Sequence, residues 1–301
     1  TYRLRIMLSP EEHTYGLYLP EIFSAYNLYI DGILIEQVGN PDPEHYVEQI
    51  QHRMFTFKGH TSVEIMLAVT DKTSASPGIQ YVPAFGNPLK VNTIRGIPVF
   101  INSSVFTLVF LVLLFSIWAF FRTRSKANAL FAGVCVCVLG YTCYPLLHTY
   151  MALRVQPWFT LEMLFYFLTF PAMLLLEYEI TGKTYKWVSY IATFTAFAGT
   201  LVTVAGVIAA DMEKAAFSYM VSGMTDILKW FTALCLVVIA FLYAKKAQGE
   251  LLLVGTVIYA SSLAADRLWP LYDPIIGGWF PEWGGTILAG MFGVILWQEL
   301  T

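Results

Sequence analysis

The sequence predicts a membrane protein in which an all-β region, residues 1–92, precedes a seven-helix transmembrane bundle, residues 93–301. Composition is the first of three observations behind this. Of all residues 57% are hydrophobic and 13% are charged, whereas soluble proteins carry about 25% charged residues. The second is a series of long apolar segments after residue 93, and the third is a strand-like alternation of side chains before it.

The seven predicted helices each contain about 20 mostly apolar residues, the length that a bilayer core requires. Their side chains are apolar on every face, and a soluble domain has no means of burying seven such helices. A soluble helical core is therefore rejected. The spans are expected at Ile101–Phe121, Ala127–Tyr150, Trp158–Ile180, Trp187–Ala210, Phe217–Tyr243, Leu251–Trp269 and Trp279–Leu300.

The first 92 residues contain several short segments with the period-2 alternation of half-buried strands. Val63, Ile65, Leu67 and Val69 alternate strictly with other residues. Asp31-Gly32 lies between two short β-rich runs and is a strong signal for a hairpin turn. The segments Tyr2–Leu8, Tyr15–Pro20, Leu28–Ile30, Ile33–Ile35, Arg53–Gly59 and Thr61–Val69 are expected to form an antiparallel, jelly-roll-like sandwich.

Alternation also predicts which side chains of these strands are buried. In the first strand Tyr2, Leu4 and Ile6 should face the core, with the arginines between them facing water. In the third strand Tyr26, Leu28 and Ile30 should share one face, and Asn27 and Tyr29 the other. The face that would meet a ligand cannot be chosen from this pattern.

Lysine and arginine in the short connections between spans predict the orientation, because cytoplasmic loops carry an excess of these residues. The odd-numbered connections hold Arg122, Arg124, Lys126, Lys183, Lys186, Lys245 and Lys246, and the even-numbered ones hold only Arg154, Lys214 and Arg267. We therefore expect the β region outside the cell and the C-terminal end inside, in a bacterial inner membrane. Both ends of the chain suggest a piece of a longer protein.

No enzyme, cofactor or metal site is expected from the motifs. The chain contains no HExxH, GxSxG, P-loop or CxxC pattern. The last span has no lysine for a retinal Schiff base, and His148 is the only histidine of the membrane region. All four cysteines lie within spans and are expected to be small buried apolar residues. A net charge of −3 without a basic tract argues against nucleic acid as a partner.

Ionisable residues within the spans are candidates for binding, because charges in a bilayer are costly and are usually functional or paired. Most of them are expected in the outer halves of the helices, where they could line a ligand pocket. The alternative is that Asp226 and Lys229 form an internal ion pair. In that case Asp266, Arg267 and Glu282 are ordinary charges at loop edges. Glu177 and Glu179 are expected to face water at the inner end of the third span. The candidate ligand-binding residues are His148, Glu162, Asp226, Lys229, Asp266, Arg267 and Glu282.

The combination of the segment LYLPEIFSAYNLYIDGILIEQVG with seven spans resembles the bacterial seven-transmembrane receptors with diverse intracellular signalling modules, the 7TM-DISM family. The resemblance rests on architecture and on the strand-then-Asp-Gly hairpin within residues 24–32. It implies an outer jelly roll similar to carbohydrate-binding modules. It also implies a cytoplasmic output module, such as a histidine kinase of a two-component system or a nucleotide cyclase, which this chain lacks, and a homodimer.

The expected function is therefore that of a sensory receptor, which binds an extracellular small molecule, such as a carbohydrate, and signals through its helices. The alternative is a small-solute transporter that uses the charged residues of the third, fifth and sixth spans. An internal repeat and paired broken helices, which transporters often show, are not seen in the sequence. Lipid is the one further partner expected.

Overall fold

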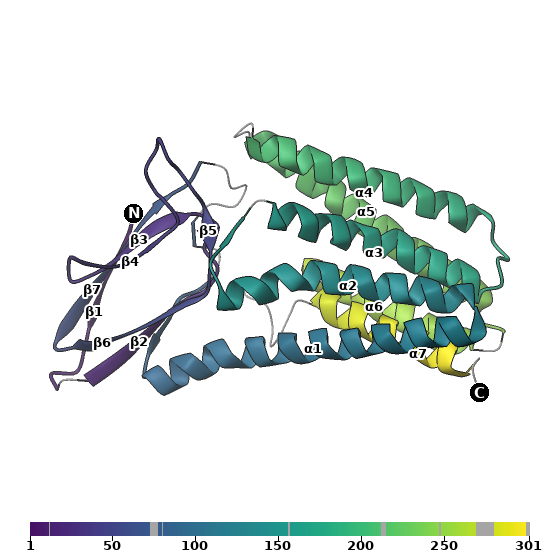
Figure 1. The fold of residues 1–301 in the computed structure, drawn as a ribbon, viewed down its shortest axis with the longest axis horizontal. Helices are drawn as coiled ribbons and strands as arrows, with labels where there is room; N and C mark the ends of the chain where they lie inside the picture. Colours follow the sequence, from purple (N-terminus) through teal and green to yellow (C-terminus); the bar gives the residue numbers. More distant parts are fainter. Residues whose placement is uncertain are drawn as a thin grey trace. The chain divides into compact units, whose positions relative to one another are not determined.

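In the computed structural model the described residues are 1–11, 13–72, 78–79, 81–155, 157–211, 215–246, 248–268 and 280–298. They form two compact units (Figure 1). The first unit combines Thr1–Ile101, Tyr144–Phe159 and Ile208–Ala215, and the second combines Asn102–Cys143, Thr160–Val207 and Ala216–Thr301. The helices α1 (Pro88–Thr123) and α2 (Lys126–Tyr150) each begin in one unit and end in the other.

The β region of the first unit consists of two antiparallel sheets. One has the strand order β1-β7-β3-β4 and the other the order β6-β2-β8. Their bounds are β1 Tyr2–Met7, β2 His13–Leu19, β3 Ala25–Ile30, β4 Ile33–Val38, β6 Arg53–Gly59, β7 Ser62–Thr70 and β8 Ala84–Gly86. A separate pair is formed by β5 (Gln49–Ile50) and β9 (Leu153–Arg154).

One apolar core joins the two sheets. It contains Leu17 and Leu19 of β2, Leu28 of β3, and Ile65 and Leu67 of β7, all of which are buried. This two-sheet packing is the expected sandwich, while its jelly-roll character stays a prediction. The predicted division of β3 is confirmed, because the side chains that share a face with Leu28, those of Tyr26 and Ile30, are buried as well.

The hairpin at Asp31-Gly32 is confirmed. Both residues have positive φ, 49° and 79°, as a type I′ turn between β3 and β4 requires. The carboxylate of Asp31 also accepts a hydrogen bond of 2.8 Å from the backbone N–H of Glu64 in β7. The turn is thereby fixed to the neighbouring strand as well as to its own hairpin.

The prediction for β1 was wrong for part of the strand. Tyr2 and Leu4 are 50% and 58% exposed, and within the strand Ile6 packs against the core. The reason is the position of β1 at the edge of a four-stranded sheet that faces a three-stranded one.

The second unit is helical. Beyond α1 and α2 the described helices are α3 (Trp158–Ile180), α4 (Trp187–Asp211), α5 (Ala215–Tyr243), α6 (Gly249–Leu268) and α7 (Phe280–Gln298). They lie lengthwise beside one another (Figure 1). A single apolar core takes a buried side chain from each helix: Leu113, Phe131, Leu174, Val188, Leu236, Leu252 and Phe292, in order from α1 to α7.

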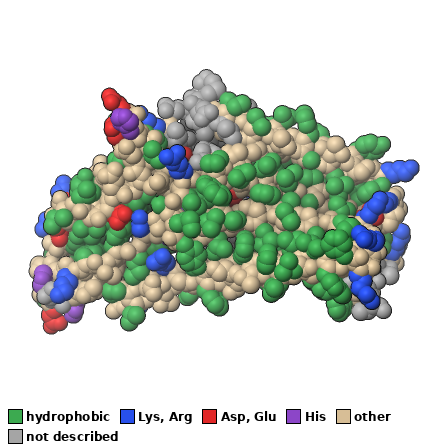
Figure 2. Space-filling view, viewed as in Figure 1, with side chains coloured by type: hydrophobic (Ala, Val, Ile, Leu, Met, Phe, Trp, Pro, Cys, Tyr) green, Lys and Arg blue, Asp and Glu red, His purple; other side chains and the backbone are tan. Residues whose placement is uncertain are grey.

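Six of these helices are long and apolar enough to cross a membrane. In each of the six helices, at most 39% of the most apolar 18-residue stretch is buried within the protein. The remaining apolar side chains, such as Phe197, Leu234 and Phe241, lie on the surface, and Figure 2 shows such side chains over much of the helical region. A multi-pass membrane protein explains this surface, because lipid can cover it. The seventh span stays a prediction, because the apolar part of α7 is the shorter stretch Trp283–Gln298.

The start of α1 differs from the prediction, since the helix begins at Pro88 rather than near Ile101. Asn87 caps it: its side-chain oxygen accepts a hydrogen bond of 3.0 Å from the backbone N–H of Leu89. Pro88 then occupies the first helical position, where its missing N–H is not needed. The predicted span was shorter because it followed the uninterrupted apolar run, whereas the cap and the first turns of the helix precede that run.

Glycines give a test of the helix packing. A methyl group added at Gly140 in α2 would overlap the ring of Phe165 in α3, whereas one at Gly133 of the same helix would meet nothing within 4 Å. Small residues at such contacts let membrane helices approach closely. Gly140→Ala should cost about 1–3 kcal/mol through overpacking, while Gly133→Ala should gain roughly 0.5–1 kcal/mol of helix propensity.

The measurement is the melting temperature of the purified protein, followed by the fluorescence of tryptophans, all of which lie after residue 93. Gly140→Ala should lower this temperature and Gly133→Ala should leave it equal or higher. An unchanged or raised value for Gly140→Ala would show that α2 and α3 do not pack at this contact.

Candidate functional site

The candidate site is a cluster of Glu21, His52 and His148 in the first unit. Glu21 follows Pro20 at the end of β2, and His52 lies between β5 and β6. His148 lies in the last turn of α2. One ligand atom from each residue lies within 4.8 Å of the others.

Both histidines approach the same carboxylate oxygen. The distance from the His52 Nε2 atom to the Glu21 Oε1 atom is 3.4 Å, and that from the His148 Nε2 atom is 3.6 Å. The side chain of His148 is 2% exposed, and those of His52 and Glu21 are 14% and 18% exposed. The group is therefore largely withdrawn from water but is not sealed.

Aromatic stacking fixes the two imidazoles. The ring of His52 is stacked on that of His148, with centroids 5.3 Å apart and planes 10° from parallel. The ring of His52 is also stacked on the ring of Tyr18, with centroids 5.9 Å apart. Tyr144 meets the ring of His148 edge-on at 5.0 Å. Each imidazole is thus held in one orientation by its neighbours.

A hydrogen bond adds to this orientation. The Tyr18 hydroxyl and the His52 Nδ1 atom are 2.5 Å apart, which leaves the Nε2 atom of His52 directed at Glu21. Burial, together with the negative charge of Glu21, raises the pKa of Tyr18 to about 12, so its hydroxyl stays protonated. The Nδ1 atom of His148 is buried and makes no hydrogen bond with any described residue.

The charge state of Glu21 follows from its neighbours. Burial by itself raises the pKa of this carboxyl, but the contact with His52 and the positive charge that His148 and His52 can carry outweigh burial. The pKa of Glu21 therefore lies below its usual value, and the residue is an anion at neutral pH. An anionic oxygen next to two imidazole nitrogens can accept protons or share a cation with them.

The backbone also joins the sandwich to the end of α2. The N–H of His52 donates a hydrogen bond of 3.3 Å to the carbonyl of His148, one of the carbonyls that the end of a helix leaves without a partner inside the helix. Directly beside it, Ile50 of β5 pairs with Leu153 of β9. Side-chain and backbone contacts thus connect the same two segments.

Of the residues proposed from the sequence, His148 is part of this cluster, and the other six belong to the second unit. Asp226 and Lys229 lie on one face of α5 with their charged atoms 3.9 Å apart, as the ion-pair alternative predicted. Glu162 of α3 and Asp266 of α6 are partly buried. The side chains of Arg267 and Glu282 lie outside the described part of the chain.

Sequence reasoning missed Glu21 and His52. They are far from His148 in the chain, and their loops carry no motif that marks them as ligands. The short pairing of β5 with β9 brings the three residues together, and β9 has only two residues. A strand this short gives no alternation to detect.

Glu177 of α3 was predicted wrongly. It is fully buried rather than facing water, and neither carboxylate oxygen has a hydrogen-bond partner among the described residues. The neighbouring Glu179 is different: it forms an ion pair of 3.2 Å with Lys183. A carboxyl group without a partner in a membrane-spanning helix is costly and is therefore a second candidate for function.

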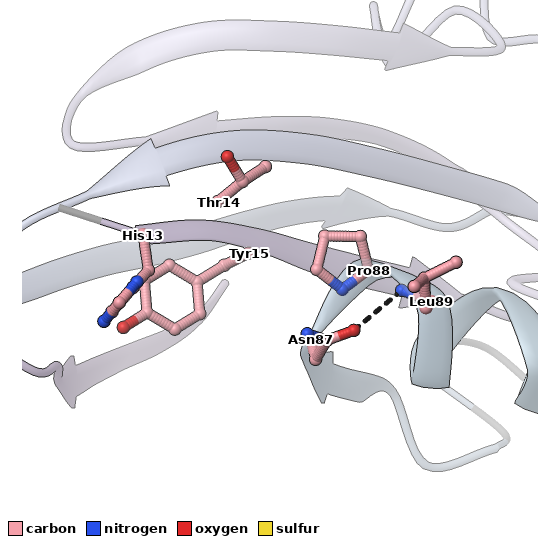
Figure 3. A pocket seen from close by; sticks show the side chains of 6 residues that line it. All are labelled: His13, Thr14, Tyr15, Asn87, Pro88 and Leu89. Atoms are coloured by element: carbon pink, nitrogen blue, oxygen red, sulfur yellow. Dashed lines mark hydrogen bonds between the residues drawn. The ribbon is translucent and has the colours of Figure 1, made fainter.

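A pocket in the first unit is formed by β2 and the start of α1. It is lined by His13, Thr14, Tyr15, Asn87, Pro88 and Leu89 (Figure 3). One face of the Tyr15 ring is stacked on Phe85 with centroids 5.4 Å apart, and Asn87 is engaged in capping α1. A sugar site needs a free aromatic face with several polar groups directed at one point.

No protein-family model matches the chain, and a comparison with curated proteins finds no similar sequence. Function is therefore inferred from the architecture and from the two groups of buried polar residues described above.

Proposed function

We propose that the chain is the sensory part of a bacterial transmembrane receptor, in which the β region detects an external ligand and the helices transmit the signal. One observation carries this proposal: the end of α2 lies in the same compact unit as the β sandwich. The cluster of Glu21, His52 and His148 and the β5–β9 pair connect the two. A ligand that moves the β5–β6 loop would act directly on a helix that continues into the membrane.

Signalling in this scheme is a shift between two helix arrangements. An external ligand shifts the equilibrium only by the difference between its affinities for the two states. The β5–β6 loop, which carries His52, is the element whose position would differ between them. The 7TM-DISM resemblance supports a jelly-roll sensor, a seventh span and a cytoplasmic output module outside this chain, with a homodimer as the signalling form.

The orientation supports detection from outside. Lys and Arg side chains gather at one end of the helical unit, as Figure 2 shows, and they belong to the connections α1–α2, α3–α4 and α5–α6. Because cytoplasmic loops carry an excess of Lys and Arg, this end of the helices faces the cytoplasm. The β region, which precedes α1 in the chain, is then exposed to the periplasm.

A transporter for small solutes is the second candidate, and Glu177 favours it. Buried carboxyl groups without partners occur in the proton and ion relays of transporters. The Asp226–Lys229 pair on α5 would be a further part of such a path. A transporter must move solute across the membrane, whereas a receptor needs only to change conformation.

Cysteine labelling tests the orientation. In a variant without native cysteines, cysteine at His60, an exposed residue beside β6, should react with an impermeant maleimide once the outer membrane is opened. Cysteine at Lys183, in the α3–α4 connection, should react only after the inner membrane is also permeabilised. The reverse pattern would contradict an external β region.

A second experiment separates the receptor from the transporter. A thermal-shift screen with sugars, amino acids, nucleosides and lipids identifies a ligand. The protein is then placed in proteoliposomes with spin labels at Thr123, the last residue of α1, and at Lys183, in the α3–α4 connection. The receptor predicts that ligand changes the distance between the labels without crossing the membrane.

The outcome that favours the transporter is solute flux. Flux that is lost in Glu177→Gln or Asp226→Ala, but kept in Glu179→Gln, would overturn the receptor proposal. Glu179 is a matched control, because it lies two residues from Glu177 and its charge is already paired with Lys183.

A further inference from the structure

The three side chains of the cluster include two imidazoles and one carboxylate, a set of groups that binds divalent transition metals. We propose that Glu21, His52 and His148 form a binding site for such an ion, with Zn²⁺ as the expected one. A fourth coordination position on the ion would be open to water or a ligand. Nothing in this inference depends on whether the helices signal or transport.

Distances favour a shared ion over direct hydrogen bonds. Ordinary N–H to oxygen hydrogen bonds measure about 2.7–3.2 Å between heavy atoms, and the two contacts to Glu21 Oε1, at 3.4 and 3.6 Å, are longer. Ligands of tetrahedral zinc lie about 2.0–2.1 Å from the ion, which places them roughly 3.3 Å from one another. The two separations from the Glu21 Oε1 atom are close to the edges of that tetrahedron.

The same atom of each imidazole is available for the ion. Both rings present Nε2 to the Glu21 Oε1 atom, and because the stacked rings are only 10° from parallel, one ring would turn to bring both nitrogen lone pairs onto one ion. The Nδ1 atom of His52 is bonded to the Tyr18 hydroxyl. A second partner of this kind commonly fixes the ring and tautomer of a histidine that binds metal. Tyr18 is accordingly a positioning residue.

Burial favours a cation as the occupant. The site combines a carboxyl group with the fully buried His148, whose other nitrogen has no partner among the described residues. Without an ion, two stacked imidazoles share a single oxygen at long distance. A divalent ion would give each of the three groups a short bond and would balance the charge of Glu21.

A bound ion would have a structural consequence. His148 belongs to the last turn of α2, while Glu21 and His52 belong to loops of the sandwich. Metal bonds to all three would hold the β5–β6 loop and the end of α2 together. An ion at this position would therefore stabilise the arrangement in which sandwich and helix are joined.

The test uses the purified full chain in nanodiscs, freed of metal with a chelator. Zn²⁺ is titrated in competition with a chromophoric chelator, and Co²⁺ is used as a spectroscopic probe. We expect one ion per chain, and the intense visible absorption of tetrahedral Co²⁺. His52→Ala, His148→Ala and Glu21→Gln should each weaken Zn²⁺ binding by roughly tenfold or more, and Tyr18→Phe by about tenfold.

His60→Ala is the matched control, because His60 is exposed and lies in the same β region. It should leave the affinity unchanged. X-ray absorption at the zinc edge of the unmodified protein supplies evidence that needs no variant: two imidazoles and oxygen should surround the ion. This measurement decides the matter if a variant fails to fold.

Three results would each overturn the site. The unmodified chain could bind no ion, the Glu21→Gln and His52→Ala variants could bind as tightly as the unmodified chain, or the absorption spectrum could lack imidazole ligands. A cluster without metal would then be a histidine–carboxylate contact that only joins the two segments. The receptor proposal would still stand in that case, because it rests on the contacts and not on the ion.

Discussion

The absence of water around the apolar helices is the constraint on which the rest of the structure depends. Most of their surface is apolar, so lipid must take the place of water, and every backbone polar group has to be bonded within the helices. Prolines inside α1, α2 and α3 are tolerated in such segments because packing against neighbouring helices supports them. Under the same constraint, a buried group without a partner, such as Glu177, is expensive to keep.

Polar contacts gain importance where α2 leaves the apolar region. In its last turn the helix exposes carbonyls that need partners, and the β5–β6 loop supplies one through the N–H of His52. The imidazole of the same residue meets His148 and Glu21. One loop of the sandwich thus satisfies the backbone of the helix and orients its buried histidine. Motion of that loop and motion of the helix end are therefore linked.

Sequence patterns predicted the elements whose signals are local. Asp31-Gly32 is a turn because Asp and Gly themselves tolerate positive φ, and Tyr26 is buried because alternation places it with Leu28. Patterns failed where distant segments decide. Tyr2 is exposed on a strand at the edge of its sheet, and His52 joins His148 because a two-residue strand pairs across about a hundred residues of chain. Glu177 was misplaced because the pattern indicates depth in the helix but not which neighbours surround it.

The central claim is that the sandwich and the end of α2 form one cooperative unit. Hydrogen exchange of the unmodified protein in nanodiscs tests it most directly. The amide of His52 and the hydrogen-bonded amides of the β5–β9 pair should exchange as slowly as those of β3 and β7, because the bond from His52 to His148 and the strand pairing hold them. Exchange of these amides at the rate of a free loop, with β3 and β7 still protected, would contradict the account.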